Sequence, residues 1–237
     1  MSLAGQSVVV VGGASGIGLS VARLANERGA EVTIVDVDAS KLARVRADHP
    51  KIRTTAGDVT VEASMKAAFH ERAAIDHVYV SAGTTKLGGI LDADVSEQLA
   101  PLVLRLWGNV HVIRAAASKV RAGGSFTFTG GISTDRPVPG AWVSSVATAA
   151  AEQLARAMAI ELAPIRFNAV APGWTDTPMW DGILGEHKAK VFEDVAAKQL
   201  TGRLSRPEET AEAVLFLMST EAVTGEVLHV DGGGRLV

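Results

Sequence analysis

Short runs of β-branched and other apolar residues alternate along the chain with stretches of helical periodicity. Such runs are typical of strands buried on both faces, and their alternation with helices indicates a parallel sheet with right-handed crossovers. The pattern therefore predicts an α/β fold, a doubly wound parallel sheet of about seven strands with helices on both faces, in a single domain over residues 1–237. The predicted strands lie within residues 7–13, 31–37, 51–59, 76–83, 124–130, 165–173 and 226–233.

The stretches between these strands predict the helices that cover the sheet. The clearest of them are residues 16–29, 39–49, 61–73, 95–121 and 141–164. Residues 179–206 form a mixed segment without a predicted strand. We expect this segment to lie over the substrate cleft as a lid.

The composition narrows what such a domain can do. The chain has 237 residues, of which 47% are hydrophobic, so it can build a substantial core. Its net charge of −3 gives no indication of a nucleic acid or membrane partner. The absence of cysteine excludes disulfides, a thiolate nucleophile and cysteine-based metal sites, and we expect no metal. Because the N-terminus lacks signal-peptide features, we expect a cytoplasmic protein with a small-molecule substrate.

The first chemical motif is VGGASGIG, between the first predicted strand and the first predicted helix. Glycines in this position let the backbone approach a pyrophosphate, and the helix N-terminus then offers unpaired N–H groups and its dipole. A glycine-rich turn without a ligand is the alternative for the pattern alone. The residues predicted to hold the pyrophosphate are Gly12, Ser15, Gly16, Ile17 and Gly18.

An acidic residue follows at the end of the second predicted strand. Asp36 lies 18 residues after Gly18, a spacing that suits a carboxylate accepting hydrogen bonds from the adenosine ribose hydroxyls. The same carboxylate would repel a 2′-phosphate, and Val37 and Asp38 supply no arginine to receive one. The sequence therefore favours NAD(H) over NADP(H) as the cofactor. Alternatively, Asp36 caps the next helix.

With these motifs in order, the chain resembles the short-chain dehydrogenase/reductase family over essentially its whole length. The glycine spacing is similar to the family's Thr-Gly-x-x-x-Gly-x-Gly, with Val11 in place of the threonine. The segments GDV, SAG and APGWTDTPM resemble the family's adenine-binding, fourth-strand and nicotinamide-binding segments. The resemblance implies a Rossmann-type fold and a nicotinamide cofactor. The further cofactor-binding residues that it implies are Asp58, Val59, Ser81, Ala82, Gly83, Pro172, Gly173 and Thr177.

The four catalytic positions of the family hold other residues in this chain. The family uses Asn, Ser, Tyr and Lys, the last two as Tyr-x-x-x-Lys on one helix. Alignment on the segment ELAP places Ser144 at the tyrosine position and Thr148 at the lysine position. Gly131 stands at the serine position and Arg105 at the asparagine position. The first turns of the helix over 141–164 thus lack a group that titrates near neutral pH.

Three of these replacements can still act chemically. Thr148 can hydrogen-bond a ribose hydroxyl, and Ser144 can hydrogen-bond a carbonyl, although serine is too weak an acid to give up a proton unaided. Arg105 is a permanent cation with five donors. It can polarise a carbonyl, clamp a substrate carboxylate or pair with a cofactor phosphate. The alternative is an arginine that extends to solvent.

Several other polar residues are weaker candidates. Asn109 comes one turn after the family's asparagine position, and Tyr79, the only tyrosine, is expected in the core. His187 lies in the predicted lid segment, where a solvated surface histidine is the simpler interpretation. A further group follows the fifth strand, either as substrate contacts or as part of a turn: Ser133, Asp135 and Arg136.

Two functions fit these residues. The first is an NAD(H)-dependent oxidoreductase with an atypical active site, acting on a carbonyl, an alcohol or a quinone-like substrate that needs little proton assistance. The second is a catalytically silent NAD(H)-binding regulator. In either case the family resemblance and the small residues of the helices within 95–121 and 141–164 lead us to expect a homotetramer or homodimer.

Overall fold

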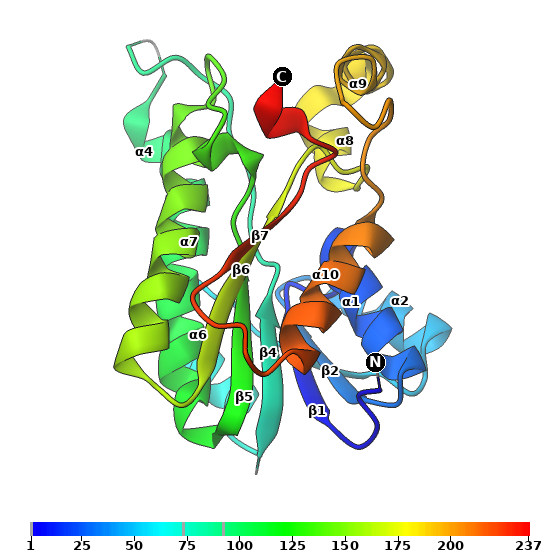
Figure 1. Cartoon of the computed structure of the whole chain (residues 1–237), viewed down its shortest axis with the longest axis vertical. Coiled ribbons are helices and arrows are strands. Elements are labelled where there is room, and N and C mark those ends of the chain that lie inside the picture. The colour runs from blue at the N-terminus through cyan, green and yellow to red at the C-terminus, as the bar shows by residue number, and fades with distance from the viewer. Residues whose placement is uncertain (1, 73, 92) are drawn as a thin grey trace.

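The computed structural model shows seven parallel strands in one sheet, in the order β3-β2-β1-β4-β5-β6-β7 (Figure 1). The structure describes residues 2–72, 74–91 and 93–237. The observed order reverses direction between β1 and β4, so the sheet is doubly wound and the predicted fold class is confirmed. The strands are β1 Ser7–Val11, β2 Glu31–Asp36, β3 Arg53–Ala56, β4 Ile75–Val80, β5 Val120–Thr129, β6 Arg166–Pro172 and β7 Val227–Val230.

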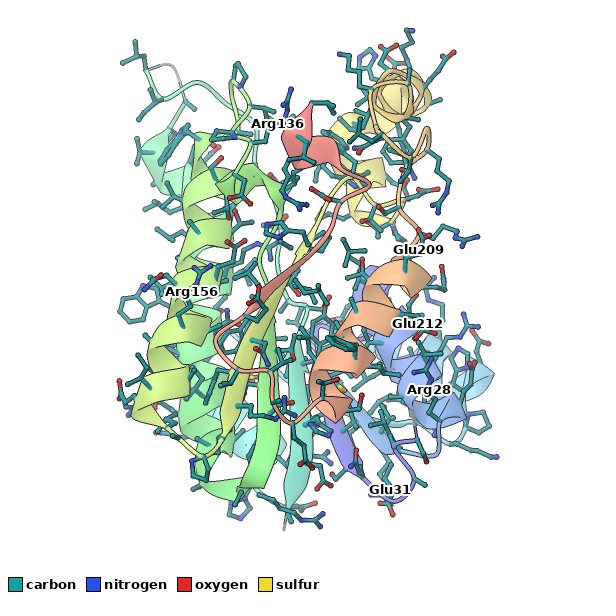
Figure 2. All side chains as sticks on the ribbon, in the orientation of Figure 1. Arg28, Glu31, Arg136, Arg156, Glu209 and Glu212 are labelled. Carbon is teal, nitrogen blue, oxygen red and sulfur yellow. The ribbon has the colours of Figure 1, made fainter. Side chains whose placement is uncertain are left out.

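Helices cover both faces of this sheet (Figure 1). On one side lie α1 (Gly16–Glu27), α2 (Ala39–Asp48) and α10 (Pro207–Ser219), and on the other lie α3 (Glu62–Phe69), α6 (Gly108–Ala116) and α7 (Trp142–Glu161). An ion pair of 2.6 Å between Arg28 Nη2 and Glu212 Oε2 links the end of α1 to α10 (Figure 2). The helix predicted over 61–73 is shorter in the structure, where it spans Glu62–Phe69. The last residue of the predicted range, Ala73, lies outside the described residues.

Alternation along the strands divides the core into two layers. Val8 and Val10 of β1 pack in the cluster with α1 and α10, whereas Val9 and Val11 pack in the cluster with α3, α6 and α7. All four valines are buried because side chains of a strand point to opposite faces in turn. The continuous apolar runs of the sequence therefore reflect a sheet that is covered on both faces.

The boundary between the predicted helix 95–121 and the fifth strand differs from the sequence prediction. Strand β5 begins at Val120 rather than Gly124. The register between β4 and β5 shifts between Ile75 and His77, and Gly123, with a φ of +80°, lies within the irregular part of β5. The Cα of Gly124 packs close to the Asp76 carbonyl, where a Cβ would come within 2.5 Å of that oxygen. The glycines thus mark a bulge and a close backbone approach rather than the end of the strand.

The long helix predicted over 95–121 is interrupted in the structure, and one interruption contains Arg105. It is built from α4 (Val95–Gln98), α5 (Ala100–Leu102), a π-helical turn at Val103–Trp107, α6, and a 3-10 turn at Ala117–Lys119. The Asn109 side-chain amide donates to the Arg105 carbonyl at 2.6 Å, which supplies a partner inside the widened turn. Such π turns are frequent at functional sites, and this one contains Arg105.

Residues 179–206 form a helical excursion above the carboxyl ends of the strands (Figure 1). It contains α8 (Met179–Leu184), a 3-10 turn at Gly185–His187 and α9 (Lys188–Ala196). A single bridge between Thr175 and Ser205 ties its two ends together. Within the described ranges, we find no helix with the length and apolar character needed to cross a bilayer.

Candidate active site

A cavity of about 840 Å³ opens at the carboxyl ends of the strands, a size within the range of small-molecule sites. Its lining comes from the segments that follow β1, β2, β3, β4, β5 and β6, together with the first turns of α7 and the excursion of residues 179–206. This is the edge, next to the switch point between β1 and β4, where ligands bind in open parallel sheets.

The glycine-rich turn after β1 is shaped to receive a phosphate group. Gly12 has a φ of +75°, and a Cβ there would meet the Ala82 backbone nitrogen at 2.5 Å, so the turn requires glycine. Ser15 precedes α1 in an extended conformation without a side-chain capping bond among the described residues, which leaves the first-turn N–H groups open to the cavity. These features fit the pyrophosphate of a dinucleotide.

Most residues predicted to bind the cofactor line this cavity, and Gly18 is the exception. A Cβ on Gly18 would lie 2.3 Å from the Gly12 carbonyl oxygen, so this glycine permits close packing of the turn on α1 and does not face the cavity. The predicted residues that do line the cavity are Gly12, Ser15, Gly16, Ile17, Asp36, Asp58, Val59, Ser81, Ala82, Gly83, Thr148, Pro172, Gly173 and Thr177.

Asp36 stands at one end of the cavity as a partly buried carboxylate. Its Oδ2 accepts from the Ala14 N–H at 3.0 Å and its Oδ1 from the Asp38 N–H at 3.1 Å. The cap of α2 is Asp38, whose side chain accepts from two backbone N–H groups of the first turn. The alternative that Asp36 caps this helix is therefore wrong. Lys41 also lines this end, and its Nζ lies 3.6 Å from an Asp38 oxygen.

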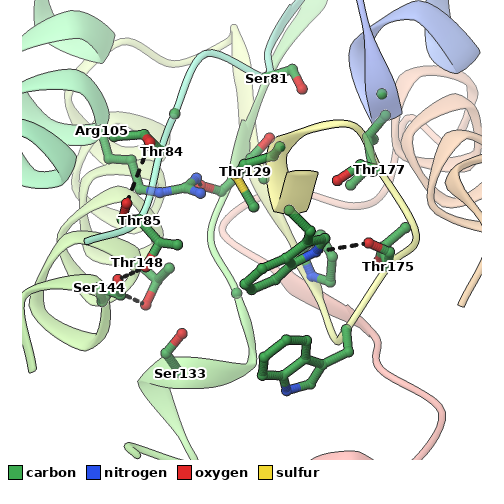
Figure 3. Close-up of a pocket in the computed structure, with 18 of the residues that line it drawn as sticks. Ser81, Thr84, Thr85, Arg105, Thr129, Ser133, Ser144, Thr148, Thr175 and Thr177 are labelled. Atoms are coloured by element: carbon green, nitrogen blue, oxygen red, sulfur yellow. Dashed lines mark hydrogen bonds between the residues drawn. The ribbon is translucent and has the colours of Figure 1, made fainter. Parts of the chain in front are cut away.

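Two hydroxyls of α7 face the other end of the cavity (Figure 3). Ser144 and Thr148 lie one helical turn apart, and both residues are buried, with exposed fractions of 7% and 4%. The Ser144 hydroxyl shares a hydrogen bond with the Thr85 hydroxyl from the segment after β4. Thr148 Oγ1 donates to the Ser144 carbonyl at 2.9 Å and lies 3.0 Å from the Thr134 hydroxyl. Two pairs of neutral hydroxyls, Thr85 with Ser144 and Thr134 with Thr148, thus lie where the sequence alignment predicts the family's tyrosine and lysine positions.

Arg105 points into the site from the π-helical turn (Figure 3). Its Nη1 donates to the Thr129 carbonyl at 2.6 Å, and its guanidinium packs on the Cα of Gly83, where a Cβ would come within 2.9 Å of Cζ. Burial lowers the pKa of the guanidinium while Tyr79 and Glu152 oppose that shift, and arginine stays charged in either case. The alternative of an arginine extending to solvent is therefore wrong.

Gly131, which the sequence alignment predicts at the family's serine position, packs against Thr148. A Cβ on Gly131 would meet Thr148 Cγ2 at 3.0 Å, so a serine side chain would crowd the threonine. Gly131 and Thr148 therefore fit each other sterically.

Comparisons with known proteins identify the family. The family model described as Enoyl-(Acyl carrier protein) reductase matches residues 12–234. A short-chain dehydrogenase/reductase of Stachybotrys chlorohalonatus is 32% identical, with 99% of each chain covered. The chain belongs to the short-chain dehydrogenase/reductase family. The chain is also 38% identical to the cis-4-hydroxycyclohexanecarboxylate dehydrogenase of Sinomonas cyclohexanicum. That alignment covers 98% of this chain and 97% of the relative. This short-chain dehydrogenase/reductase is accordingly an oxidoreductase of a family that binds a nicotinamide cofactor.

A solved structure shares the fold of this short-chain dehydrogenase/reductase. A small-chain dehydrogenase determined in complex with NADPH superposes with a TM-score of 0.87 and 28% identity, covering 98% of this chain and all of that one. That neighbour binds the phosphorylated cofactor, so the choice between NAD(H) and NADP(H) depends on this chain's own residues around Asp36.

The structure also reveals polar residues of this short-chain dehydrogenase/reductase that the sequence reasoning missed. Thr85 and Thr134 hydrogen-bond Ser144 and Thr148, and Glu152 lies buried behind them with an exposed fraction of 3%. The position of Glu152 could have been predicted from the sequence. It follows Thr148 by four residues and so lies on the same helix face, where the neighbours are alanines. The two threonines had none, because their proximity depends on loops after β4 and β5.

The weaker candidates divide into three groups. Tyr79 is fully buried and accepts from the Thr129 hydroxyl at 2.9 Å, as expected for a core residue. His187 is largely exposed, near Glu186, and does not line the cavity. Among the residues after β5, Asp135 pairs with His229 at 2.8 Å, whereas two others line the cavity: Ser133 and Arg136.

An aromatic wall of two tryptophans lines the cavity. Trp174 and Trp180 stack with ring centroids 4.3 Å apart, and Trp180 Nε1 donates to the Thr175 carbonyl at 3.0 Å. The excursion of residues 179–206 contributes further lining from Met179, Trp180, Leu184, Val195, Lys198 and Gln199.

Proposed function

We propose that the protein is an NAD(H)-dependent oxidoreductase for a carbonyl, alcohol or quinone-like substrate, with an atypical active site. The observation that carries the proposal is the Arg105 guanidinium, held inside the cavity beside the Ser144 and Thr148 hydroxyls. A bound nicotinamide dinucleotide would supply or accept the hydride. Residues 179–206 would act as the lid over the reacting groups.

The roles of the chain's own residues follow from their positions. Arg105 places a fixed positive charge where a developing oxyanion would be stabilised, and Ser144 donates a hydrogen bond to the same oxygen. Thr148, at the position aligned with the family's lysine, accepts a hydrogen bond from a ribose hydroxyl, which leaves its own proton free for another acceptor. Gly12, Ser15, Gly16 and Ile17 bind the pyrophosphate, and the remaining cavity-lining residues predicted above hold the adenosine and nicotinamide ends.

The distribution of charge along the cavity favours a substrate with an anionic group. Among the described lining residues, the acidic side chains are those of Asp36, the last residue of β2, and Asp58, two residues after β3. Lys41 lies at the same end as Asp36. The other basic side chains of the lining are those of Arg105, Arg136 and Lys198, which come from the π-helical turn, the segment after β5 and the excursion of residues 179–206. The relative from Sinomonas cyclohexanicum is named for a cyclic substrate that carries a carboxylate. We therefore favour an apolar or cyclic carbonyl compound with a carboxylate.

Single-turnover oxidation of bound NADH, followed by its absorbance, tests this function. The substrates are 4-oxocyclohexanecarboxylate, its methyl ester as the uncharged match, a simple quinone and a neutral ketone. We expect oxidation by at least one of them and a clear preference for the carboxylate over its ester. Normal NADH binding without any substrate-dependent oxidation would instead favour the silent NAD(H)-binding regulator.

The cofactor preference gives a prediction at Asp36. We expect NADH to bind at least about 10-fold more tightly than NADPH, because the carboxylate and a 2′-phosphate repel each other at a partly desolvated position. Asp36→Ala removes that repulsion and should narrow the difference in affinity between the two dinucleotides. Calorimetric titration of both dinucleotides against wild type and variant measures it. Tighter binding of NADPH by the wild type would contradict the assignment.

The surface gives a prediction about assembly. Three large apolar side chains are exposed on the helical layer of α6 and α7: Trp107 at 55%, Val146 at 49% and Ile160 at 85%. Exposed apolar side chains on a layer of small residues suit contact with a second copy of the chain. We propose a homotetramer or homodimer. Light scattering at micromolar concentration should give a multiple of 24.6 kDa, and a mass of 24.6 kDa alone would contradict it.

A further inference from the structure

A buried carboxyl group lies behind the hydroxyls of the active site and has no part in the function proposed so far. Glu152 sits on α7 one turn after Thr148, and its exposed fraction is 3%. Its Oε1 accepts from the Gly131 N–H at 3.1 Å and from the Thr134 hydroxyl at 2.9 Å. A buried ionisable group with directed partners next to a cavity is a candidate for a chemical role.

The surrounding backbone leaves room for this side chain and no more. A Cβ on Gly130 would lie 2.3 Å from Glu152 Oε1, so the glycine at the end of β5 is required by the carboxyl group. The next residue, Gly131, donates its N–H to the same oxygen. The segment that would hold a serine in the family is thus shaped around Glu152.

A chain of hydroxyls connects Glu152 to the cavity. Thr134 Oγ1 lies 2.9 Å from Glu152 Oε1 and 3.0 Å from Thr148 Oγ1, and Thr148 lines the cavity. Each hydroxyl has one proton, so the donors in this series of hydrogen bonds can point either towards Glu152 or towards the cavity. When Glu152 is ionised, Thr134 donates to the carboxylate, and Thr148 donates either to Thr134 or to the Ser144 carbonyl. When Glu152 is protonated, the donors reverse and point towards the cavity.

The charged groups around Glu152 set its protonation. Burial is the largest influence and raises the pKa of Glu152, while the bonds from Gly131 and Thr134 lower it. Asp135, from the turn after β5, raises the pKa and His229, from β7, lowers it. Arg105, from the π-helical turn, also interacts electrostatically with Glu152. Because burial outweighs the opposing contacts, the pKa lies above its ordinary value.

We propose that Glu152 is the proton store of this active site and exchanges protons with a substrate oxygen through Thr134 and Thr148. The inference rests on the proposed function. In the reducing direction, the O–H bond of Glu152 breaks as Thr134 gains that proton, Thr134 passes its own proton to Thr148, and Thr148 passes its own to the substrate oxygen. The step leaves Glu152 ionised and the product protonated. After the product leaves, water in the open cavity returns the proton along the same chain.

Three variants separate a proton store from a structural carboxyl group. Glu152→Gln keeps the size and the acceptor for Gly131 but cannot exchange a proton. Thr134→Val interrupts the hydroxyl chain and leaves Glu152 in place. Glu161→Gln, an exposed glutamate at the end of the same helix, is the matched control.

The first readout is independent of turnover. Infrared difference spectra recorded across a pH titration should show the C=O band of a protonated carboxyl group that persists above the ordinary glutamate pKa. This band should be retained in Glu161→Gln, shifted in Thr134→Val and lost in Glu152→Gln. The same band in wild type and Glu152→Gln would overturn the proposal, whatever the activity.

The second readout is the pH dependence of single-turnover reduction. We expect the wild-type rate to be highest below the pKa of Glu152 and to fall as the pH rises through it, because reduction needs the protonated form. Glu152→Gln and Thr134→Val should each lose about 10²-fold in rate, together with this pH dependence and most of the solvent deuterium isotope effect. Equal rates and pH profiles in wild type and Glu152→Gln would overturn the proposal and leave the oxidoreductase standing. No turnover in the wild type would instead defeat the proposed function, and the infrared titration would still decide on Glu152.

Discussion

Arg105→Ala should lower the single-turnover rate by about 10²- to 10³-fold, the range seen when one donor to a developing oxyanion is removed. The guanidinium is directed into the cavity by its bond to the Thr129 carbonyl and by the space above Gly83, so it requires no reorganisation during the reaction. The dissociation constant of NADH should change by less than about 3-fold, since this charge acts on the reacting oxygen. Stopped-flow absorbance and calorimetry measure the two quantities.

Arg105→Lys provides the matched comparison for charge. Lysine keeps the positive charge but lacks the planar fork that reaches Thr129 and packs on Gly83. We expect an intermediate rate, closer to Arg105→Ala than to wild type. If Arg105→Ala turns over as fast as wild type, the enzyme survives but the role assigned to Arg105 is wrong. If NADH binding is lost in parallel with the rate, the arginine binds the cofactor instead.

Arg166→Ala should reduce the free energy of unfolding by about 3–4 kcal/mol, the largest stability effect that we expect from a single side chain. Arg166 is 5% exposed at the start of β6, and its Nη2 donates to the Met218 carbonyl at 2.6 Å. Its Nη1 donates to the carbonyls of Leu217, Thr220 and Val223. One guanidinium therefore caps the C-terminal end of α10. Its removal takes a donor from all four carbonyls, although Thr220 keeps the Val223 N–H and Val223 keeps the Asn168 amide as donors.

Arg156→Ala is the matched control for this effect. Arg156 is exposed on α7 (Figure 2), and it should change the free energy of unfolding by less than about 0.5 kcal/mol. For a chain of this length, the loss predicted for Arg166→Ala corresponds to a fall in Tm of roughly 10 °C. Calorimetric melting of both variants measures it. Equal Tm values for the two variants would show that the capping bonds contribute little.

The arrangement of strands and helices could be predicted because it depends on local patterns. The apolar runs of β1, β4 and β6 fill strands that are covered on both faces, and the glycines of VGGASGIG mark the turn into α1. The carboxylate of Asp36 could be placed at the cavity for the same reason, since the end of β2 is fixed by the parallel register with β1. The errors came where glycines had two meanings, as at Gly124, which lies inside β5.

The candidate site could be predicted only in part. Alignment of motifs placed Ser144, Thr148 and Arg105 correctly on the cavity wall, yet it left the direction of the Arg105 side chain open. That direction depends on the π-helical turn and on the space above Gly83, and neither feature can be predicted from the periodicity of the sequence. The aromatic wall of Trp174 and Trp180 was missed because it requires the loop after β6 to fold against the first turn of α8.

By itself, the sequence determined the doubly wound sheet and the glycine-rich turn into α1, and it predicted other residues at the family's four catalytic positions. These features depend on residue type and on spacing along the chain, because strands have a period of two residues and tight turns require glycine. Only the tertiary structure decided that Arg105 faces the cavity and that Thr134 joins Glu152 to Thr148. A hydrogen bond depends on distances of a few tenths of an ångström between atoms of different elements, and only the packing of β5 and α7 on one another fixes those distances.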